Sequence, residues 1–366
     1  MRIRLLYFCS DYQVGLTQAQ TEQVEHLAKE SQIELFCVSS EKEQEPGLHE
    51  RLKRANVNLS IIRDLDVHAN AKGLCNQIAD IVDRNHITHI NVHNNWQLGL
   101  IARLKLNLVK RRNFKTIYTI HGYRHNHPVK SIIAIATIGA ALLLFADRVI
   151  SMSKYVSKRF WFLSYKIDRV FYMMNKPEYM KKENIIDTTN LSMVFPAQFR
   201  KGKRQEILLN ALKIYVEKTG DKNAQLHLPG SGPLLESMKK LSYELGISNQ
   251  VYFYGKLSLN EVISIYEENN IALCSSNVET YGRCIAEPFM LGRCVITQKT
   301  GVATDIIKDT ENGFFFSDAN NLSEILISLK NSPHMIKQVA NKAFADRDIF
   351  FPEKVMQTYI AAISKA

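Results

Sequence analysis

Cysteine is scarce in this chain, and the few cysteines form no recognisable framework. Six occur among 366 residues, and none belongs to a CxxC pair. Five of them lie in or beside apolar runs, which is typical of reduced thiols buried in the core of an intracellular protein. The sequence therefore predicts a cytoplasmic protein without a disulfide framework.

No apolar run is long enough to cross a membrane as a helix. The first eleven residues, Met1–Asp11, hold too short an apolar stretch for a signal peptide and instead predict a first strand. The uncharged stretch 131–146 has 16 residues, whereas a spanning helix requires roughly 20.

Acidic residues are nearly missing from residues 103–169, which hold 14 Lys and Arg but only 2 Asp and Glu. This stretch accounts for the net charge of +11 and surrounds the uncharged run 131–146 with basic clusters. An apolar helix in a basic setting can lie on an anionic membrane, where each nearby cation contributes about 1 kcal/mol. We therefore expect membrane contact here, and a buried core helix is the alternative.

What the chain does contain is a repeated alternation of strand and helix patterns, typical of doubly wound parallel sheets. The length of 366 residues and the 46% hydrophobic composition suit two globular domains. The alternation stops near residue 171 and restarts at Leu191. We predict an N-terminal domain over 1–175, a linker over 176–190, a C-terminal domain over 191–335 and a helical tail over 336–366.

The most informative segment surrounds Glu279 and Glu287. An apolar strand, Ile271–Cys274, leads into it, and a short helix is expected from Gly282 to Leu291. A helix start after a strand presents free N–H groups and the positive dipole end to an anion. The two carboxylates would then lie on either side of a bound diphosphate.

This segment resembles the E-x7-E signature of retaining glycosyltransferases with the GT-B fold, above all glycosyltransferase family 4. Its flanks, including Tyr281, Gly282 and Arg283, match as well. The resemblance implies an α/β GT-B fold, in which two Rossmann-like domains face a central cleft and the tail crosses back to the N-terminal domain. It also implies that Glu279 contacts the donor sugar and Glu287 the ribose of a nucleotide sugar.

Further donor-binding residues follow from the same resemblance. The basic run after the first strand of the second domain offers Lys203 and Arg200 to a diphosphate, although Gln198 stands where the family has an Arg. A Gly-rich turn supplies Gly230 and Gly232, and Gly255 ends a strand near the expected base site. The alternatives are a solvated basic loop, a structural turn and plain strand core.

In the N-terminal half, candidate residues lie at the carboxyl ends of strands, where open α/β sheets bind ligands. His121 matches a family histidine that touches the donor sugar, and we expect it to act with Glu279 and Lys203 in catalysis. Gly15, His93 and Asn94 are candidates for the acceptor side. We expect no metal or other cofactor, although His121, His125 and His127 suggest zinc as a weaker alternative.

These features predict a hexosyltransferase-type enzyme that moves a sugar, with retention, from a nucleoside-diphosphate donor to a lipid-linked glycan in bacterial surface polysaccharide synthesis. It would lie peripherally on the inner face of the cytoplasmic membrane and bind no nucleic acid. Two alternatives remain. One is a GT-B nucleotide-sugar epimerase, and the other is a non-catalytic basic protein that binds nucleic acid or membranes.

Overall fold

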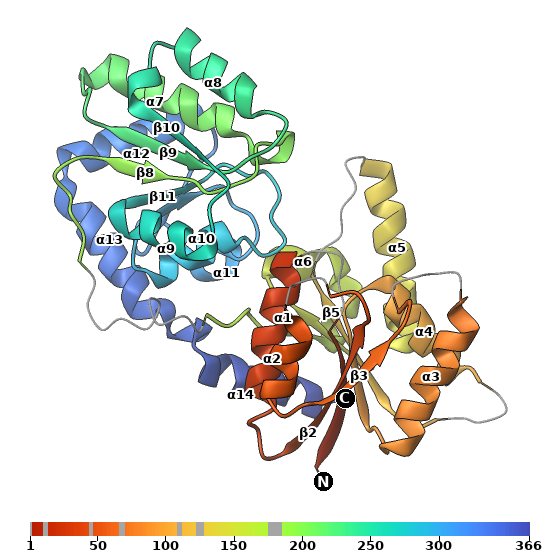
Figure 1. The fold of residues 1–366 in the computed structure, drawn as a ribbon. Coiled ribbons are helices and arrows are strands. Elements are labelled where there is room, and N and C mark those ends of the chain that lie inside the picture. The colour runs from red at the N-terminus through yellow and green to blue at the C-terminus, as the bar shows by residue number, and fades with distance from the viewer. Residues whose placement is uncertain are drawn as a thin grey trace. The chain divides into compact units, whose positions relative to one another are not determined.

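The computed structural model describes residues 2–9, 14–43, 47–65, 70–107, 112–121, 128–174 and 185–366. The chain divides into an N-terminal unit, Met1–Met173 with Phe350–Ala366, and a C-terminal unit, Met174–Ile349 (Figure 1). Each unit is built on one parallel sheet with helices on both faces. The predicted fold class, two Rossmann-like doubly wound domains, is confirmed.

The N-terminal unit contains a seven-stranded sheet in the order β3-β2-β1-β4-β5-β6-β7. Figure 1 shows α1 and α2 on one face of this sheet and α3, α4 and α5 on the other. Its strands are β1 (Ile3–Phe8), β2 (Ile33–Ser40), β3 (Asn58–Ile62), β4 (His89–Val92), β5 (Lys115–Ile120), β6 (Arg148–Ser151) and β7 (Ile167–Arg169). Its helices are α1 (Val14–Leu27), α2 (Leu48–Arg54), α3 (Ala71–Arg84), α4 (Asn95–Lys105), α5 (Pro128–Phe145), α6 (Lys154–Ser157), the 3-10 segment η2 (Lys158–Lys166) and α14 (Pro352–Ser364).

The C-terminal unit contains a six-stranded parallel sheet in the order β10-β9-β8-β11-β12-β13. Its strands are β8 (Ser192–Val194), β9 (Gln225–Pro229), β10 (Val251–Gly255), β11 (Ile271–Cys274), β12 (Cys294–Thr297) and β13 (Phe314–Phe315). Its helices are α7 (Gln205–Thr219), α8 (Leu235–Glu244), α9 (Leu259–Glu268), α10 (Arg283–Met290), α11 (Ala303–Ile306), α12 (Ala319–Asn331) and α13 (Pro333–Asp346), with short 3-10 turns η4 (Lys201–Lys203), η5 (Ser248–Gln250) and η6 (Arg347–Phe350), the last at the boundary between the units.

Both sheets reverse their strand order at one point. The reversal lies between β1 and β4 in the first sheet and between β8 and β11 in the second. The loops that leave two such strands diverge to opposite faces, which opens a crevice at their carboxyl ends. Several candidate residues follow these strands, among them His93 and Asn94 after β4, Lys203 after β8 and Glu279 after β11.

The tail does not belong to one unit. Helix α13 packs against β12 and α10 and lies within the C-terminal unit, whereas α14 belongs to the N-terminal unit. There the fully buried Tyr359 accepts a hydrogen bond at its hydroxyl from Asn91 Nδ2 at 2.9 Å. The stretch expected to cross back as one tail, 336–366, is therefore shared between the two units.

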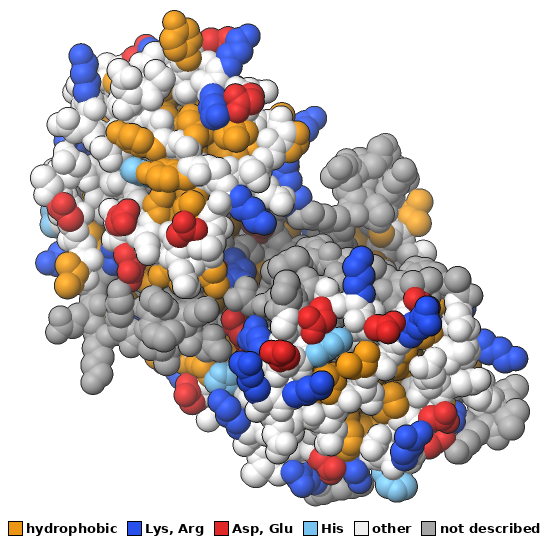
Figure 2. Space-filling view, viewed as in Figure 1, with side chains coloured by type: hydrophobic (Ala, Val, Ile, Leu, Met, Phe, Trp, Pro, Cys, Tyr) orange, Lys and Arg blue, Asp and Glu red, His pale blue; other side chains and the backbone are white. Residues whose placement is uncertain are grey.

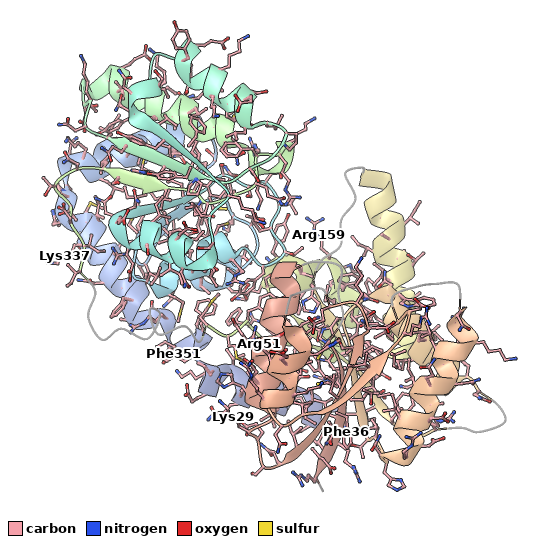
Figure 3. The ribbon with its side chains drawn as sticks, in the orientation of Figure 1. Lys29, Phe36, Arg51, Arg159, Lys337 and Phe351 are labelled. Carbon is pink, nitrogen blue, oxygen red and sulfur yellow. The ribbon has the colours of Figure 1, made fainter. Side chains whose placement is uncertain are left out.

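Two elements of the N-terminal unit differ from the sequence prediction. The charged sequence of residues 41–50 predicts a loop, yet α2 begins within them at Leu48 and buries Leu48 and Leu52. Arg51 on this helix forms two hydrogen bonds of 3.0 Å to the Glu25 carboxylate on α1 (Figure 3). The amphipathic pattern of this short helix is weak in the sequence, because only two of its positions are buried and charged residues occupy its exposed side.

The aromatic-rich sequence of residues 154–163 predicts one helix, which the structure does not form. Helix α6 ends at Ser157, and a 3-10 segment follows with a kink at Phe160. The kink buries Phe160 and Leu163 and leaves Trp161 exposed. Aromatic content alone did not reveal this change of winding.

Candidate active site

The loops that follow β8 and β11 are joined by three contacts. Ser275 Oγ donates to the Lys203 carbonyl at 2.7 Å, and the Asn277 N–H donates to the Gly202 carbonyl at 3.3 Å. Lys203 Nζ donates to Glu279 Oε1 in an ion pair. Two of the three predicted catalytic residues are therefore in direct contact at the point where the strand order reverses.

The Lys203–Glu279 pair is largely withdrawn from solvent, with each side chain only 13% exposed. Burial by itself lowers the pKa of Lys203, but the neighbouring Cys284 and Glu279 raise it, and the net pKa lies above the ordinary value. The ammonium group is therefore fully charged at neutral pH. It carries three N–H donors, so it can bind an anion while it keeps its bond to Glu279.

Glu287 is fixed by its own helix. Gly282, in the left-handed conformation with φ 93°, precedes α10. Arg283 is the first residue of α10, and its Nε donates to Glu287 Oε1, one turn further along the helix, at 2.7 Å. The Glu287 side chain is 6% exposed, and Tyr281 beside this segment is buried. The Glu287 carboxylate can accept further hydrogen bonds from hydroxyl groups of a ligand.

A cavity of about 360 Å³ opens beside Glu287. Gln198, Gly230, Lys256, Arg283 and Glu287 are among the residues that line it. The predicted residues Gly230, Arg283 and Glu287 thus meet in one cavity, whereas Lys203, Glu279 and Arg200 are not among its lining residues.

Two lining residues modify the sequence prediction. Gln198, which stands where the resemblance leads to an Arg, does line the cavity. Lys256 also lines it, immediately after β10, and was not among the predicted site residues. The signal that could have identified Lys256 is a cation at the carboxyl end of a strand next to β9.

The predicted glycine turn brings two main-chain segments unusually close. A Cβ on Gly230 would lie 1.9 Å from the Ala197 carbonyl oxygen, and one on Gly232 would lie 2.5 Å from the Phe199 carbonyl oxygen. Both residues have positive φ, 146° and 151°, and Gly230 also donates to the Gly255 carbonyl at 2.6 Å. Gly230 therefore lines the cavity, and Gly232 and Gly255 take part in the close approach of the main-chain segments beside it. Their contact with a donor phosphate or base stays a prediction.

Three side chains near the ion pair have the chemistry of metal ligands. Cys274 Sγ and Cys284 Sγ lie 3.6 Å apart, and with a Glu279 oxygen they fall within 4.8 Å of one another. Lys203 already supplies a positive charge to this carboxylate. The expectation that no metal is needed stays a prediction.

In the N-terminal unit, His121 lies in a chain of aromatic side chains. Its Nε2 is 2.8 Å from His93 Nδ1, and its Nδ1 forms a short hydrogen bond with the Tyr172 hydroxyl. The three rings are stacked, and Tyr7 packs on His93 with ring centroids 4.6 Å apart. Both ring nitrogens of His121 thus have partners within the unit.

Burial lowers the pKa of His121 to about 3 and that of His93 well below the ordinary histidine value. Both rings are therefore neutral at neutral pH. A neutral imidazole can donate one hydrogen bond, but His121 would have to release His93 or Tyr172 to bond a sugar through its ring. The catalytic role predicted for His121 stays a prediction with this condition attached.

The other candidates of this unit have structural tasks. The Asn94 side chain caps α4 by accepting from the Gln97 N–H at 2.9 Å. Gly15 is the second residue of α1, and residues 10–13 before it lie outside the described residues. His125 and His127, considered for zinc with His121, also lie outside them.

The uncharged stretch 131–146 forms most of α5 and is buried along one side only. Leu142 and Ala146 belong to the core, whereas Ile132 is 67% exposed and Leu144 is 72% exposed, so α5 is not buried all round. Among the helices within the described ranges, none is long and apolar enough to span a bilayer. Segment η2 packs on α5 and adds Trp161, which is 74% exposed.

The last turn of α5 is held by two lysines from outside the helix. Lys166 Nζ donates to the carbonyls of Leu143 and Ala146, and Lys105 Nζ to that of Phe145. Cations at a helix C-terminus compensate its unpaired carbonyls and negative dipole end. The view in Figure 2 shows Lys and Arg interspersed with Asp and Glu on the N-terminal unit, so the positive excess forms no uniform patch on that face.

Comparison with known proteins agrees with this geometry. The family model "Glycosyl transferases group 1" matches residues 175–346. The chain is 22% identical to the putative glycosyltransferase EpsD of Bacillus subtilis over 67% of this chain and 68% of EpsD. It is 20% identical to N-acetyl-alpha-D-glucosaminyl L-malate synthase of Bacillus anthracis over 78% and 77% of the two chains.

Solved structures match the whole fold. The Anabaena protein Alr3699/HepE in complex with UDP superposes with a TM-score of 0.77 at 15% identity, and the match covers 100% of both chains. The apo form of the lipopolysaccharide outer core galactosyltransferase WaaB gives a TM-score of 0.74 at 15% identity, again over 100% of both. The family model thus matches the C-terminal unit, the chain as a whole has the GT-B fold, and these findings together support a glycosyltransferase.

Proposed function

We propose that this chain is a retaining glycosyltransferase of the family 4 type, which transfers a hexose from a nucleoside-diphosphate sugar to a lipid-linked glycan. The observation that carries the proposal is the contact of Lys203 with Glu279 next to a cavity lined by Glu287. A buried cation beside a cavity that Lys256 and Arg283 also line suits a diphosphate leaving group. The buried Glu287 carboxylate suits the two hydroxyls of a ribose.

In this proposal the charge of the departing diphosphate is stabilised by Lys203, Arg200 and the start of α10. Glu279 orients the sugar by accepting hydrogen bonds from the sugar hydroxyls, while Lys203 stays bonded to the Glu279 carboxylate. The resemblance to family 4 implies that the acceptor attacks on the face that the diphosphate leaves. An oxygen of the departing phosphate then takes the acceptor's proton, so no carboxylate needs to serve as a covalent nucleophile.

The solved structures support a uridine nucleotide as the first donor to test. Alr3699/HepE binds UDP and, in a further crystal structure, UDP-glucose. WaaB, by its name, acts on the lipopolysaccharide core, which favours surface polysaccharide synthesis. The Bacillus anthracis relative is named for L-malate, which is not a lipid. Support for a lipid-linked acceptor therefore comes from α5 and η2 and not from this relative.

The test is thermal stabilisation by a panel of nucleoside diphosphates and their sugars. At a hundred times its Kd a ligand stabilises the folded state by about 2.7 kcal/mol, so we expect a clear rise in Tm with one uridine or guanosine diphosphate sugar. Glu287→Ala should abolish it, and Glu324→Ala, on the exposed side of α12, should not. A rise retained in Glu287→Ala would refute the donor-site assignment, and donor consumption without any acceptor would favour an epimerase.

We further propose that the transfer needs no metal ion, because Lys203 already provides positive charge at the leaving group. Transfer measured after treatment with a chelator should keep its rate when Mg²⁺, Mn²⁺ or Zn²⁺ is added back. A rate that depends on one of these ions would contradict the proposal and direct attention to Cys274, Glu279 and Cys284.

The exposed apolar side chains of α5 and η2 support a proposal about the acceptor and the location. Exposed Ile132, Leu144 and Trp161 lie close in sequence to exposed Lys154 and Lys158, the combination that favours an anionic phospholipid surface. We propose that the protein binds the inner face of the cytoplasmic membrane through these elements and meets a lipid-linked acceptor there.

Sedimentation with vesicles containing phosphatidylglycerol tests this membrane contact. We expect binding at low salt that weakens several-fold in Trp161→Ser and in Leu144→Ser but not in Tyr243→Ser, an equally exposed aromatic of the C-terminal unit. Equal binding of all four proteins would rule out α5 and η2 as the contact. A shift of labelled nucleic acid in physiological salt would instead favour the nucleic-acid alternative.

A further inference from the structure

A second cavity lies on the N-terminal unit, between α3 and α4. Its volume is about 420 Å³. Small apolar side chains, among them Cys75 and Ala79 of α3, form part of its lining. Its charged lining residues are Lys72 from α3, Arg103 from α4 and Arg112 from the segment before β5. We name this cavity the α3–α4 groove.

Arg112 is the buried charge of the groove. Its side chain is only 10% exposed. Two of its three nitrogens, Nε and Nη2, donate to the Asp83 carboxylate at 2.9 and 2.8 Å. The third nitrogen, Nη1, is buried and has no hydrogen-bond partner within the described structure. A buried N–H group without an acceptor costs about 1–3 kcal/mol, so an additional oxygen acceptor at this atom is energetically favourable.

The other two cations are also available. Lys72 and Arg103 are exposed, and neither forms an ion pair with a described residue. The groove is lined by three cations, and the described lining contains no carboxylate. Since Asp83 balances only one of the three charges, the groove attracts an anion with oxygen acceptors.

We propose that the α3–α4 groove binds a phosphate-type oxyanion. The planar guanidinium of Arg112, held in place by Asp83, presents Nη1 to one phosphate oxygen, and Lys72 and Arg103 bind the others. Helix α4 also packs against α5, so the phosphate can belong to a phospholipid headgroup or to a free phosphate compound. The inference goes beyond the proposed glycosyl transfer and does not depend on it.

The test is calorimetric titration of the full chain with two probes. One is inorganic pyrophosphate, and the other is a short-chain phosphatidylglycerol below its micelle concentration. Because a charge-assisted hydrogen bond to phosphate is worth roughly a factor of ten in affinity, Lys72→Gln and Arg103→Gln should each raise Kd about tenfold. Binding of pyrophosphate alone identifies a free phosphate ligand, and binding of the lipid alone identifies a headgroup site.

Matched variants separate this site from the donor site, which also favours phosphates. Lys218→Gln and Lys222→Gln, exposed on the C-terminal unit, should leave the affinity of both probes unchanged. The double variant Lys72→Gln/Arg103→Gln should keep the full nucleotide-dependent rise in Tm. Absence of binding by both probes, or equal affinity in wild type and the double variant, overturns the proposal, while loss of the nucleotide response alone would concern the proposed function.

Discussion

Single residues in this protein draw their properties from partners that are distant in sequence. Glu279 obtains its counter-charge from Lys203, 76 positions away, and His121 is held by His93 and Tyr172. The spacing of Glu279 and Glu287, together with the basic run that contains Lys203, was sufficient to select these residues as candidates. Their partners could not be predicted, because a hydrogen bond across a sheet edge leaves no periodic trace in the chain.

The buried histidine chain makes stability depend on pH. His121 has a folded-state pKa of about 3, against roughly 6.5 when unfolded. As the pH falls below 6.5 the unfolded chain takes up a proton that the folded chain does not, so stability is lost. Between pH 7 and pH 5 this histidine alone should cost about 2 kcal/mol.

Urea unfolding followed by tryptophan fluorescence measures this effect, because both tryptophans, Trp96 and Trp161, lie in the N-terminal unit. Between pH 7 and pH 5 the free energy of unfolding of His121→Gln should fall by about 2 kcal/mol less than that of the wild type. His86→Gln, which changes an exposed histidine of the same unit, should behave as wild type. Identical pH dependence in all three proteins would mean that His121 is protonated in the folded state.

Among the elements, the turn between β9 and α8 has the least tolerance for change. Gly230 approaches the Ala197 carbonyl so closely that any side chain forces the two segments apart. We expect Gly230→Ala to destabilise the C-terminal unit by about 3 kcal/mol or more. Gly220→Ala, at a helix end with open space around it, should cost about 1 kcal/mol.

Hydrogen exchange of the β8, β9 and β10 amides measures both glycine variants, since the C-terminal unit contains no tryptophan. Equal protection in the two variants would show that the turn adapts. The strand and helix pattern around it was predictable from hydrophobic periodicity, and Ile271–Cys274 and Cys294–Thr297 agree to the residue. Helix α2 and the 3-10 winding of η2 were not, because each depends on a few buried contacts and not on a repeated pattern.

The whole molecule consists of one continuous unit and one that is assembled from two pieces of chain. The seven-stranded sheet is covered partly by α14, whose Tyr359 is fully buried and bonded to Asn91. We expect Tyr359→Ala to destabilise the N-terminal unit by about 3–5 kcal/mol and to leave the C-terminal unit unchanged. Tyr359→Phe, which keeps the ring but leaves the buried Asn91 Nδ2 without its acceptor, should cost about 1–3 kcal/mol.

Unfolding of these variants can be resolved by unit, with tryptophan fluorescence for the N-terminal unit and hydrogen exchange for the C-terminal unit. A loss of similar size in both units would indicate one cooperative structure. The two-domain organisation was predictable from the break in periodicity near residue 171. The division of the tail between the units was not, because α13 and α14 have similar amphipathic patterns and only packing distinguishes them.

The divided N-terminal unit also sets an order of events on the ribosome. Residues 1–173 emerge first, but the surface that receives α14 stays uncovered until residues 350–366 have been made. The whole of the C-terminal unit is translated in the meantime, and at about 5–20 residues per second this takes on the order of 10–35 seconds. The C-terminal unit can therefore complete its folding before the N-terminal unit does. During that interval the apolar surface that later contacts Tyr359 is accessible to chaperones.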